Sequence, residues 1–113
     1  MQFSDMAKIV PKVGNCESGQ GRSRIRRDTP DCVTLYNQGK ALIKWLSNGD
    51  VVVHARGRAL ASSDVLRFNE YLSEHPFRFR QGTTELLRVT TPSGEDFQCG
   101  SIRVFSNNSY RKD

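Results

Sequence analysis

The stretch that decides the fold is KALIKWLSNGDVVVHARGR, Lys40 to Arg58. Two apolar runs rich in β-branched and aromatic residues meet at Asn48-Gly49, and Asn-Gly between such runs is the strongest short-range signal for a β-hairpin. A two-residue turn there predicts that Leu46 pairs with Val51, Trp45 with Val52, Lys44 with Val53 and Ile43 with His54. Both sides of this hairpin are then apolar near the turn, so it is either covered on both sides or exposes one side for binding.

One amphipathic helix follows the hairpin, within RALASSDVLRFNEYLSEHP, residues 58–76. Ser62, Ser63 or Asp64 can cap its first turn by accepting hydrogen bonds from free backbone amides. The helix is expected to end before Pro76, because proline disfavours helical geometry in the residue before it. At 100° per residue, one stripe faces the core and the opposite stripe faces water. The buried stripe is predicted to hold Ala61, Val65, Phe68, Tyr71 and Leu72, and the solvent stripe Arg67, Glu70 and Glu74.

The chain after the helix changes to the period of two that is typical of strands. FRFR, residues 77–80, and TELLRVTT, residues 84–91, each alternate between apolar and polar residues. A last strand in DFQCGSIRVF, residues 96–105, is expected to bend or bulge near Gly100. Residues 107–113 form a polar tail in this interpretation. The side chains predicted to be buried are Phe77, Phe79, Leu87 and Val89.

The first 40 residues show the weakest patterns. Residues 7–10 suit a short edge strand because a proline follows them, residues 14–23 suit a loop, and residues 33–36 suit a strand. RSRIRR, residues 22–27, alternates weakly. It belongs to a basic N-terminal segment, residues 1–30, that is predicted to be either an arm or an edge strand.

These elements predict an α+β fold. Parallel pairing needs a crossover of a dozen or more residues, and only the helix supplies one. We therefore expect a mostly antiparallel sheet of about five or six strands, with one amphipathic helix packed on one face. At 113 residues, the whole chain, 1–113, is expected to be a single domain.

The composition of the chain indicates the cellular compartment in which the protein is expected. No apolar run approaches the roughly 18 residues of a membrane span, and the first residues lack the apolar stretch of a secretory signal. Cys16, Cys32 and Cys99 are odd in number and widely spaced, so we expect reduced thiols in a cytoplasmic protein. Closely spaced ligand pairs of the zinc type are absent from the sequence, and neither a metal nor another cofactor is expected.

The sequence does not indicate a catalytic centre. It lacks P-loop, nucleophile-elbow and zinc-protease motifs. His75, before a proline, fits a helix C-terminal cap, and His54 fits a packed strand histidine. An enzyme is therefore not expected. The remaining enzymatic hypothesis is a ribonuclease in which His54 and His75 act as base and acid.

Arginine is the strongest functional signal. The net charge is +5, and the first 30 residues carry six basic against three acidic residues. The planar guanidinium suits phosphate and stacks on bases. Three segments, GRSRIRRD, VVHARGR and FRFRQG, predict a shared face for an RNA or DNA backbone, with Tyr36, Trp45 or Tyr110 stacking on bases. The predicted nucleic-acid-binding residues are Arg22, Arg24, Arg26, Arg27, Arg56, Arg58, Arg78 and Arg80.

Two classes of function remain open. The first is a small non-enzymatic protein that binds RNA or DNA. The second is a protein-binding inhibitor or adaptor, of the type that viruses encode against host proteins, with a larger acidic partner. The apolar hairpin favours the second class and also permits a homodimer, whereas a membrane partner is not expected. A plainer interpretation is that the strand arginines only solubilise the surface, by pairing with Glu70, Glu74, Glu85 or Asp96.

Overall fold

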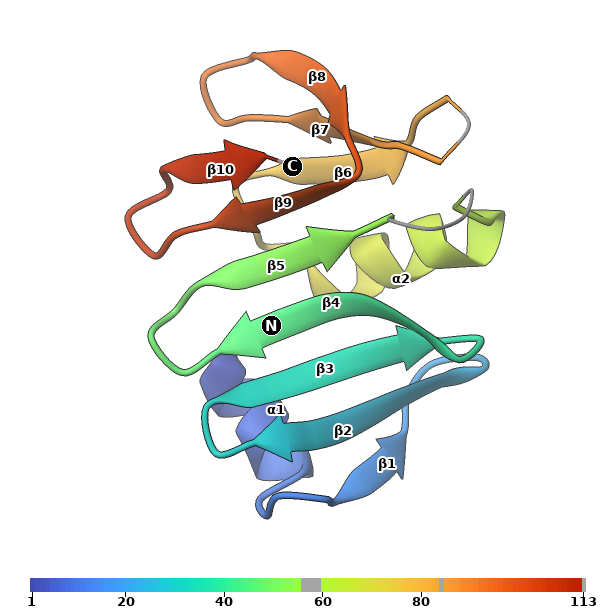
Figure 1. The fold of residues 1–113 in the computed structure, drawn as a ribbon, viewed down its shortest axis with the longest axis vertical. Coiled ribbons are helices and arrows are strands. Elements are labelled where there is room, and N and C mark those ends of the chain that lie inside the picture. Colours follow the sequence, from blue (N-terminus) through green and yellow to red (C-terminus); the bar gives the residue numbers. More distant parts are fainter. Residues whose placement is uncertain (56–59, 84, 113) are drawn as a thin grey trace.

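The computed structural model describes residues 1–55, 60–83 and 85–112. It contains a seven-stranded antiparallel sheet of order β1-β2-β3-β4-β5-β9-β10 and a three-stranded antiparallel sheet of order β6-β7-β8 (Figure 1). The elements are α1 (Phe3–Ile9), β1 (Cys16–Ser18), β2 (Ser23–Thr29), β3 (Cys32–Asn37), β4 (Lys40–Leu46), β5 (Val51–His54), α2 (Ser62–Tyr71), β6 (Arg78–Gln81), β7 (Leu87–Thr90), β8 (Asp96–Cys99), β9 (Ser101–Val104) and β10 (Tyr110–Lys112). The α+β class and the mostly antiparallel pairing agree with the sequence. The described residues form two helices and ten strands, where one helix and five or six strands were predicted.

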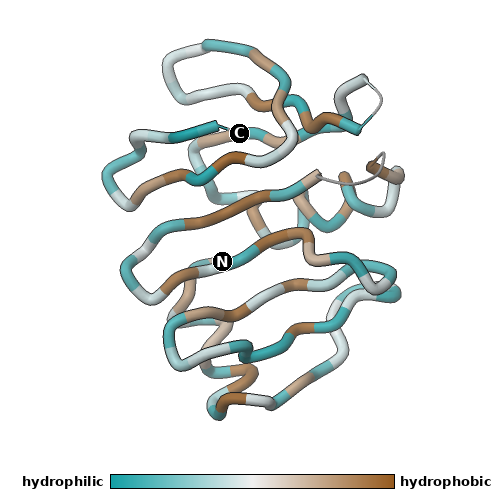
Figure 2. The backbone as a smooth tube through the Cα atoms, viewed as in Figure 1, coloured by the Kyte–Doolittle hydropathy of each residue, from teal (hydrophilic) through white to brown (hydrophobic). Residues whose placement is uncertain are grey.

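Both helices lie on the same face of the seven-stranded sheet, with α1 behind β2 to β4 and α2 behind β4 and β5 (Figure 1). The core fills the space between this face and the helices, because the strand residues that point there are apolar. Hydrophobic residues concentrate in the central strands, whereas the turns are hydrophilic (Figure 2). One buried row across the strands consists of Ile25, Leu35, Ile43, Val53 and Ile102, and the next of Val33, Trp45, Val51 and Val104.

The central hairpin forms as predicted, but the predicted register is wrong by one residue. Trp45 pairs with Val51 and Ile43 pairs with Val53. The reason is a longer turn: the Leu46 amide donates to the Asp50 carbonyl at 2.9 Å, and the Gly49 amide donates back to the Leu46 carbonyl at 2.9 Å. A glycine at positive φ after a tight turn is typical of such longer hairpin loops, and φ of Gly49 is 94°.

This register gives the hairpin one fully apolar side. Ile43, Trp45 and Val53 are completely buried against the helices. Lys44 and Val52, which pair with each other, point to the opposite side of the sheet. A homodimer through the hairpin remains a prediction, but the Trp45 side is already covered within the chain, so a dimer would have to use the Lys44 side.

The predicted strand at residues 7–10 is wrong, because the structure forms helix α1 there. The Asp5 carboxylate accepts a hydrogen bond from the Gln2 amide at 2.8 Å, which satisfies a free donor at the helix start. Met6 and Val10 are both fully buried. Their spacing of four residues places them on one side of a helix, and the same spacing would also place them on one face of a strand, so it did not distinguish the two.

Helix α2 confirms only part of its predicted stripe. Phe68, Tyr71 and Leu72 are buried, as expected, but Asp64 and Arg67 are also buried. The helix ends at Tyr71, so His75 lies beyond it and is not the C-terminal cap that the sequence predicted.

The last part of the chain follows the predicted period. The four side chains Phe77, Phe79, Leu87 and Val89 are buried, and Gly100 separates β8 from β9 at the predicted bend. The chain ends hold more strand than the sequence patterns indicated. Within the predicted polar tail, residues 110–112 form β10, and within the basic N-terminal segment β1 is the edge strand of the sheet, whereas residues 23–29 form β2 between β1 and β3.

Candidate nucleic-acid interface

The face of the seven-stranded sheet that points away from both helices is called the open face. A row of directly paired residues crosses it, one from each of six neighbouring strands. Paired residues point to the same side of a sheet, so the row brings four cations together. At about 4.8 Å per strand spacing, it spans about 24 Å. The row consists of Arg26, Thr34, Lys44, Val52, Arg103 and Arg111.

The open face also carries aromatic rings and further polar groups beside this row. Arg24 pairs with Tyr36, one step along β2 and β3 from the row. At the other end of the strands, the Arg103 guanidinium lies over the Phe105 ring, 5.5 Å from its centroid. Tyr36 and Phe105 are both partly exposed. The face therefore offers cations flanked by two aromatic surfaces.

Asp28 partly balances the charge of the open face. It lies 3.5 Å from the Arg26 guanidinium, and it accepts hydrogen bonds from the hydroxyls of Thr34 and Tyr36. Burial and the nearby Asp28 charge raise the pKa of the Tyr36 phenol, which therefore stays protonated and keeps donating. The Tyr36 ring is held in place by this bond.

Asp50 holds Arg103 in a fixed position. Its carboxylate accepts from Arg103 at 2.7 and 3.0 Å and from the Ser106 amide at 3.0 Å. Burial raises the pKa of Asp50, but the bonds from Arg103 and Ser106 outweigh burial, so the net pKa is lowered and the group stays ionised. On the described part of the open face, six cations thus stand against the carboxylates of Asp28 and Asp50. The six are Arg22, Arg24, Arg26, Lys44, Arg103 and Arg111.

The structure separates the arginines that the sequence grouped together. Arg22, Arg24 and Arg26 line one hollow on the open face. Arg27 points to the helix side, where it donates to the Val10 carbonyl at 3.1 Å and lies over the Phe3 ring. Among the predicted nucleic-acid-binding residues that the structure describes, only Arg22, Arg24 and Arg26 lie together on the open face.

The remaining predicted arginines lie elsewhere. Arg78 and Arg80 are exposed on β6, in the three-stranded sheet, where Arg78 donates to the His75 carbonyl and Arg80 lies 3.4 Å from Asp96. The Asp96 pair is one of those expected if the arginines only solubilise the surface. Arg56 and Arg58 lie outside the described residues.

Sequence reasoning missed Lys44, Arg103 and Arg111. Arg103 is the one cation of β9, Lys44 lies between apolar residues of β4, and Arg111 lies beside Lys112 in the segment interpreted as a polar tail. The correct hairpin register would have placed Lys44 opposite Val52, away from the core. Arg103 and Arg111 join the row because β5 pairs with β9. These two strands are about 50 residues apart in the sequence, so no local sequence pattern predicts their pairing.

The two histidines lie on opposite sides of the sheet. His54 follows the buried Val53 and alternates with it toward the open face. His75 packs between the rings of Phe77 and Phe79, at 5.8 and 5.9 Å, on the helix side. This arrangement does not bring the two imidazoles together as an acid and base pair.

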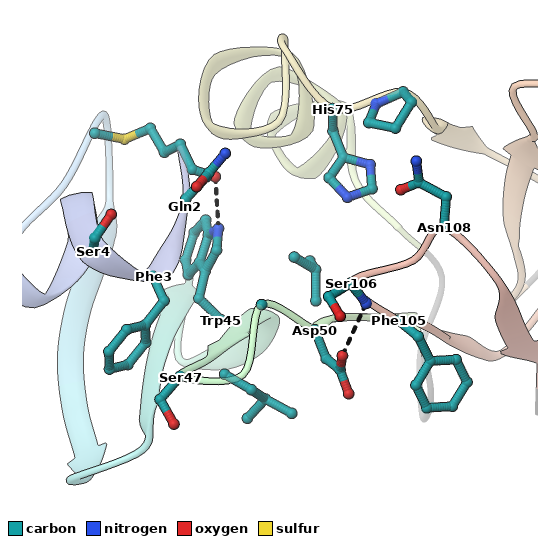
Figure 3. A pocket seen from close by; sticks show the side chains of 15 residues that line it. Gln2, Phe3, Ser4, Trp45, Ser47, Asp50, His75, Phe105, Ser106 and Asn108 are labelled. Carbon is teal, nitrogen blue, oxygen red and sulfur yellow. Dashed lines mark hydrogen bonds between the residues drawn. The ribbon is translucent and has the colours of Figure 1, made fainter.

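His75 borders a cavity of about 380 Å³ at the end of the sheet (Figure 3). Its Nδ1 accepts the Phe77 amide at 3.2 Å. Burial, followed by the charges of the Met1 ammonium and Arg78, lowers the pKa of His75 to about 4, so the ring is neutral at pH 7. With Nδ1 as acceptor, the proton is on Nε2. Side chains of Gln2, Trp45 and Asn108 also line this cavity.

In residues 1–55, 60–83 and 85–112, no three histidine, cysteine or acidic side chains cluster as metal ligands would. No helix in that same part of the chain has the length and apolar character needed to cross a membrane. No protein-family model, no curated protein and no solved structure matches the chain at a significant level.

Proposed function

We propose that this protein binds single-stranded RNA or DNA on the open face of its seven-stranded sheet. The observation that supports the proposal is the cross-strand row in which Arg26, Lys44, Arg103 and Arg111 point away from the helices. Cations spaced along a surface track a phosphate backbone, and exposed aromatic rings stack on unpaired bases. Tyr36 and Phe105 supply such rings on this face.

The geometry favours a single strand over a duplex. The open face is a layer of strands, and it projects no helix or arm of the described residues into a groove of the kind that duplex readers use. Exposed sheet surfaces with aromatic residues are instead a recurrent platform for splayed bases. Contacts of this type depend on charge and stacking, so we expect little sequence preference.

The expected affinity depends steeply on salt. If four or five phosphates are neutralised, the slope of log K against log salt is about −3 for a single strand. Raising salt from 50 to 200 mM should then weaken binding by roughly 10²-fold. Fluorescence anisotropy with a random-sequence 12-nucleotide RNA and its DNA counterpart measures this slope directly.

A matched pair of variants tests whether the open face is responsible. Lys44→Gln removes a cation from the centre of the row, whereas Lys8→Gln removes an exposed lysine from α1, behind the sheet. We expect Lys44→Gln to weaken binding several-fold and to reduce the salt slope by about 0.7, and Lys8→Gln to do neither. Equal effects of the two variants, or no binding by micromolar wild-type protein at 50 mM salt, would overturn the proposal.

An acidic protein partner on the same face is the alternative. Val52 lies at the centre of the row and is partly exposed, which gives the face one apolar contact among its cations. A protein complex that buries Val52 would lose affinity in Val52→Asp and would depend less on salt than a polyanion complex. Such a result, together with no oligonucleotide binding, would favour the inhibitor or adaptor function.

A further inference from the structure

A small hollow lies at one corner of the open face, beside the edge strand β1. It encloses about 240 Å³ and is lined by residues of β1, β2, β3 and two turns. At about 30 Å³ per water molecule, this is room for roughly eight waters, enough for a phosphate group and part of a sugar. The lining residues are Cys16, Arg22, Arg24, Arg26, Tyr36 and Gly39.

Three guanidiniums therefore converge on one concave site. Arg22, Arg24 and Arg26 are all exposed, and Arg22 and Arg24 form no ion pair with any residue that the structure describes. Arg24 donates from Nε to the Cys16 sulfur at 3.4 Å, which orients its guanidinium within the hollow. The local positive charge is thus less compensated here than at Arg103, which Asp50 holds.

The position of the hollow suits the end of a nucleic-acid strand. On one side β1, only three residues long, is the last strand of the sheet. On another side the β3–β4 turn closes the hollow, with Gln38 and Gly39 at φ of 54° and 79°. A backbone that follows the cation row across the sheet reaches this corner and has no further sheet to follow.

The number of cations favours a terminal phosphate over an internal one. A phosphomonoester carries about −1.5 to −2 charges at pH 7 and three terminal oxygens, whereas an internal phosphodiester carries one charge. Arginine binds such oxygens through paired N–H donors, and three arginines, with Arg26 partly balanced by Asp28, leave about two positive charges to match the larger charge. The Tyr36 ring, held by Asp28, lies beside them as a surface for the terminal sugar or base.

We propose that the hollow lined by Arg22, Arg24 and Arg26 binds the terminal phosphomonoester of a single-stranded nucleic acid. This inference rests on the proposed function, because it assigns one end of the same bound strand. The shared chemistry of a 5′ and a 3′ terminal phosphate does not distinguish the two ends, so the test includes both.

The test compares three unlabelled oligonucleotides of one sequence, with a 5′ phosphate, a 3′ phosphate or hydroxyls at both ends. Each competes with an internally labelled strand at constant salt. We expect one phosphorylated form to bind about tenfold more tightly than the hydroxyl form. That advantage should fall below twofold in the Arg22→Gln, Arg24→Gln double variant. In the matched Lys44→Gln, Arg111→Gln double variant, all three forms should bind more weakly while the advantage remains.

The outcomes separate the two proposals. Equal binding of the three forms, or an advantage that survives in the Arg22, Arg24 variant, would overturn the terminal-phosphate site and leave the open-face function standing. Absence of binding by every form would overturn both.

The exposed Cys16 thiol gives a second, independent measurement of the hollow. The preferred phosphorylated strand should slow alkylation of Cys16 by iodoacetamide several-fold more than the hydroxyl strand does, measured by mass spectrometry. Cys32, which is less exposed and lies outside the hollow, serves as the internal reference. Equal protection of Cys16 by both strands would contradict the proposal.

Discussion

Asp64 shows how a buried charge can fix the start of a helix. Its carboxylate is 1% exposed and accepts from Lys40 Nζ at 2.7 Å, from Asn37 Nδ2 at 2.6 Å and from the Ala61 amide at 2.7 Å. Burial raises the pKa of this group, but the bonds from Lys40 and Asn37 outweigh burial and lower the net value. One acid therefore ties the β3–β4 turn region to the first turn of α2.

Removal of this carboxylate should be costly. In Asp64→Ala the Lys40 ammonium, itself largely buried, loses its partner, and such a loss costs about 3 kcal/mol. Urea unfolding monitored by circular dichroism measures the change. The control is Glu74→Gln, an exposed acid beyond the same helix, which should change stability by less than about 0.5 kcal/mol. Similar small effects of both variants would mean that the buried network contributes little.

His75 makes stability depend on pH in a defined window. Its pKa is lowered from 6.5 to about 4 in the folded chain, with burial as the first cause. Between these values the unfolded chain binds a proton that the folded chain does not, so stability increases with pH from about 4 to 6.5 and this contribution is constant above. The buried His75 therefore destabilises the folded chain increasingly as the pH falls from about 6.5 to about 4.

The variant His75→Gln should remove this dependence. We expect wild-type protein to lose more stability than His75→Gln between pH 7 and pH 5, in paired urea titrations at each pH. Carboxylates titrate in both proteins, so the difference between them isolates the imidazole. Parallel losses in the two proteins would show that His75 can be protonated without unfolding.

At the scale of elements, the β4–β5 turn fixes the hairpin register. Gly49 has φ of 94°, and a Cβ placed there would lie 3.0 Å from the Ser106 Cβ of the β9–β10 turn. Gly94 has a similar φ of 92°, but a Cβ there would meet nothing within 4 Å. The two glycines thus share a backbone conformation and differ in their surroundings.

A comparison of alanine at these two positions tests that difference. Gly94→Ala should lower the free energy of unfolding by about 1 kcal/mol, because a residue other than glycine is strained in the left-handed backbone conformation. Gly49→Ala should cost more, by roughly another 1 kcal/mol, because the two turns must also separate. Thermal and urea unfolding measure both values. Equal losses of stability in the two variants would show that Ser106 can move away from the added methyl group at little energetic cost.

Elements with a strong local period could be predicted from the sequence. The alternation in residues 77–80 and 87–90 gave the correct buried faces, because side chains in a strand alternate strictly. The hairpin was predicted correctly but its register was not, because the Asn-Gly pair does not determine whether the loop has two or three residues. Helix α1 was missed because its two buried residues, Met6 and Val10, give a pattern too short to detect against a strand.

The candidate site was less accessible to sequence reasoning than the fold. Arg24 and Arg26 could be placed on one face from their spacing alone. Their neighbours Arg103 and Arg111 depend on which distant strands pair, and that is decided by the shared core and not by any local motif. The predicted link between the arginines of β6 and those after β5 stays a prediction, because Arg56 and Arg58 lie outside the described residues, and β6 itself belongs to the three-stranded sheet.

At the scale of the whole molecule, α2 couples the two sheets. Its Phe68 ring lies 5.9 Å from Phe79 in the three-stranded sheet, and its Tyr71 ring lies 6.1 Å from Trp45 in the seven-stranded sheet. All four side chains belong to one contiguous buried cluster. The two sheets therefore share a core, and we expect them to unfold as one cooperative unit.

Trp45, the only tryptophan of the chain, makes this expectation testable, because its fluorescence reports on the larger sheet alone. Phe79→Ala opens a cavity in the smaller sheet and should cost about 3 to 5 kcal/mol. If the core is shared, the Trp45 transition in urea shifts by the full amount and coincides with the transition seen by far-ultraviolet circular dichroism. Leu66→Ala, at a position 54% exposed on α2, is the control and should shift neither. An unchanged Trp45 transition in Phe79→Ala would show that the three-stranded sheet unfolds separately, and that the open face can remain intact without it.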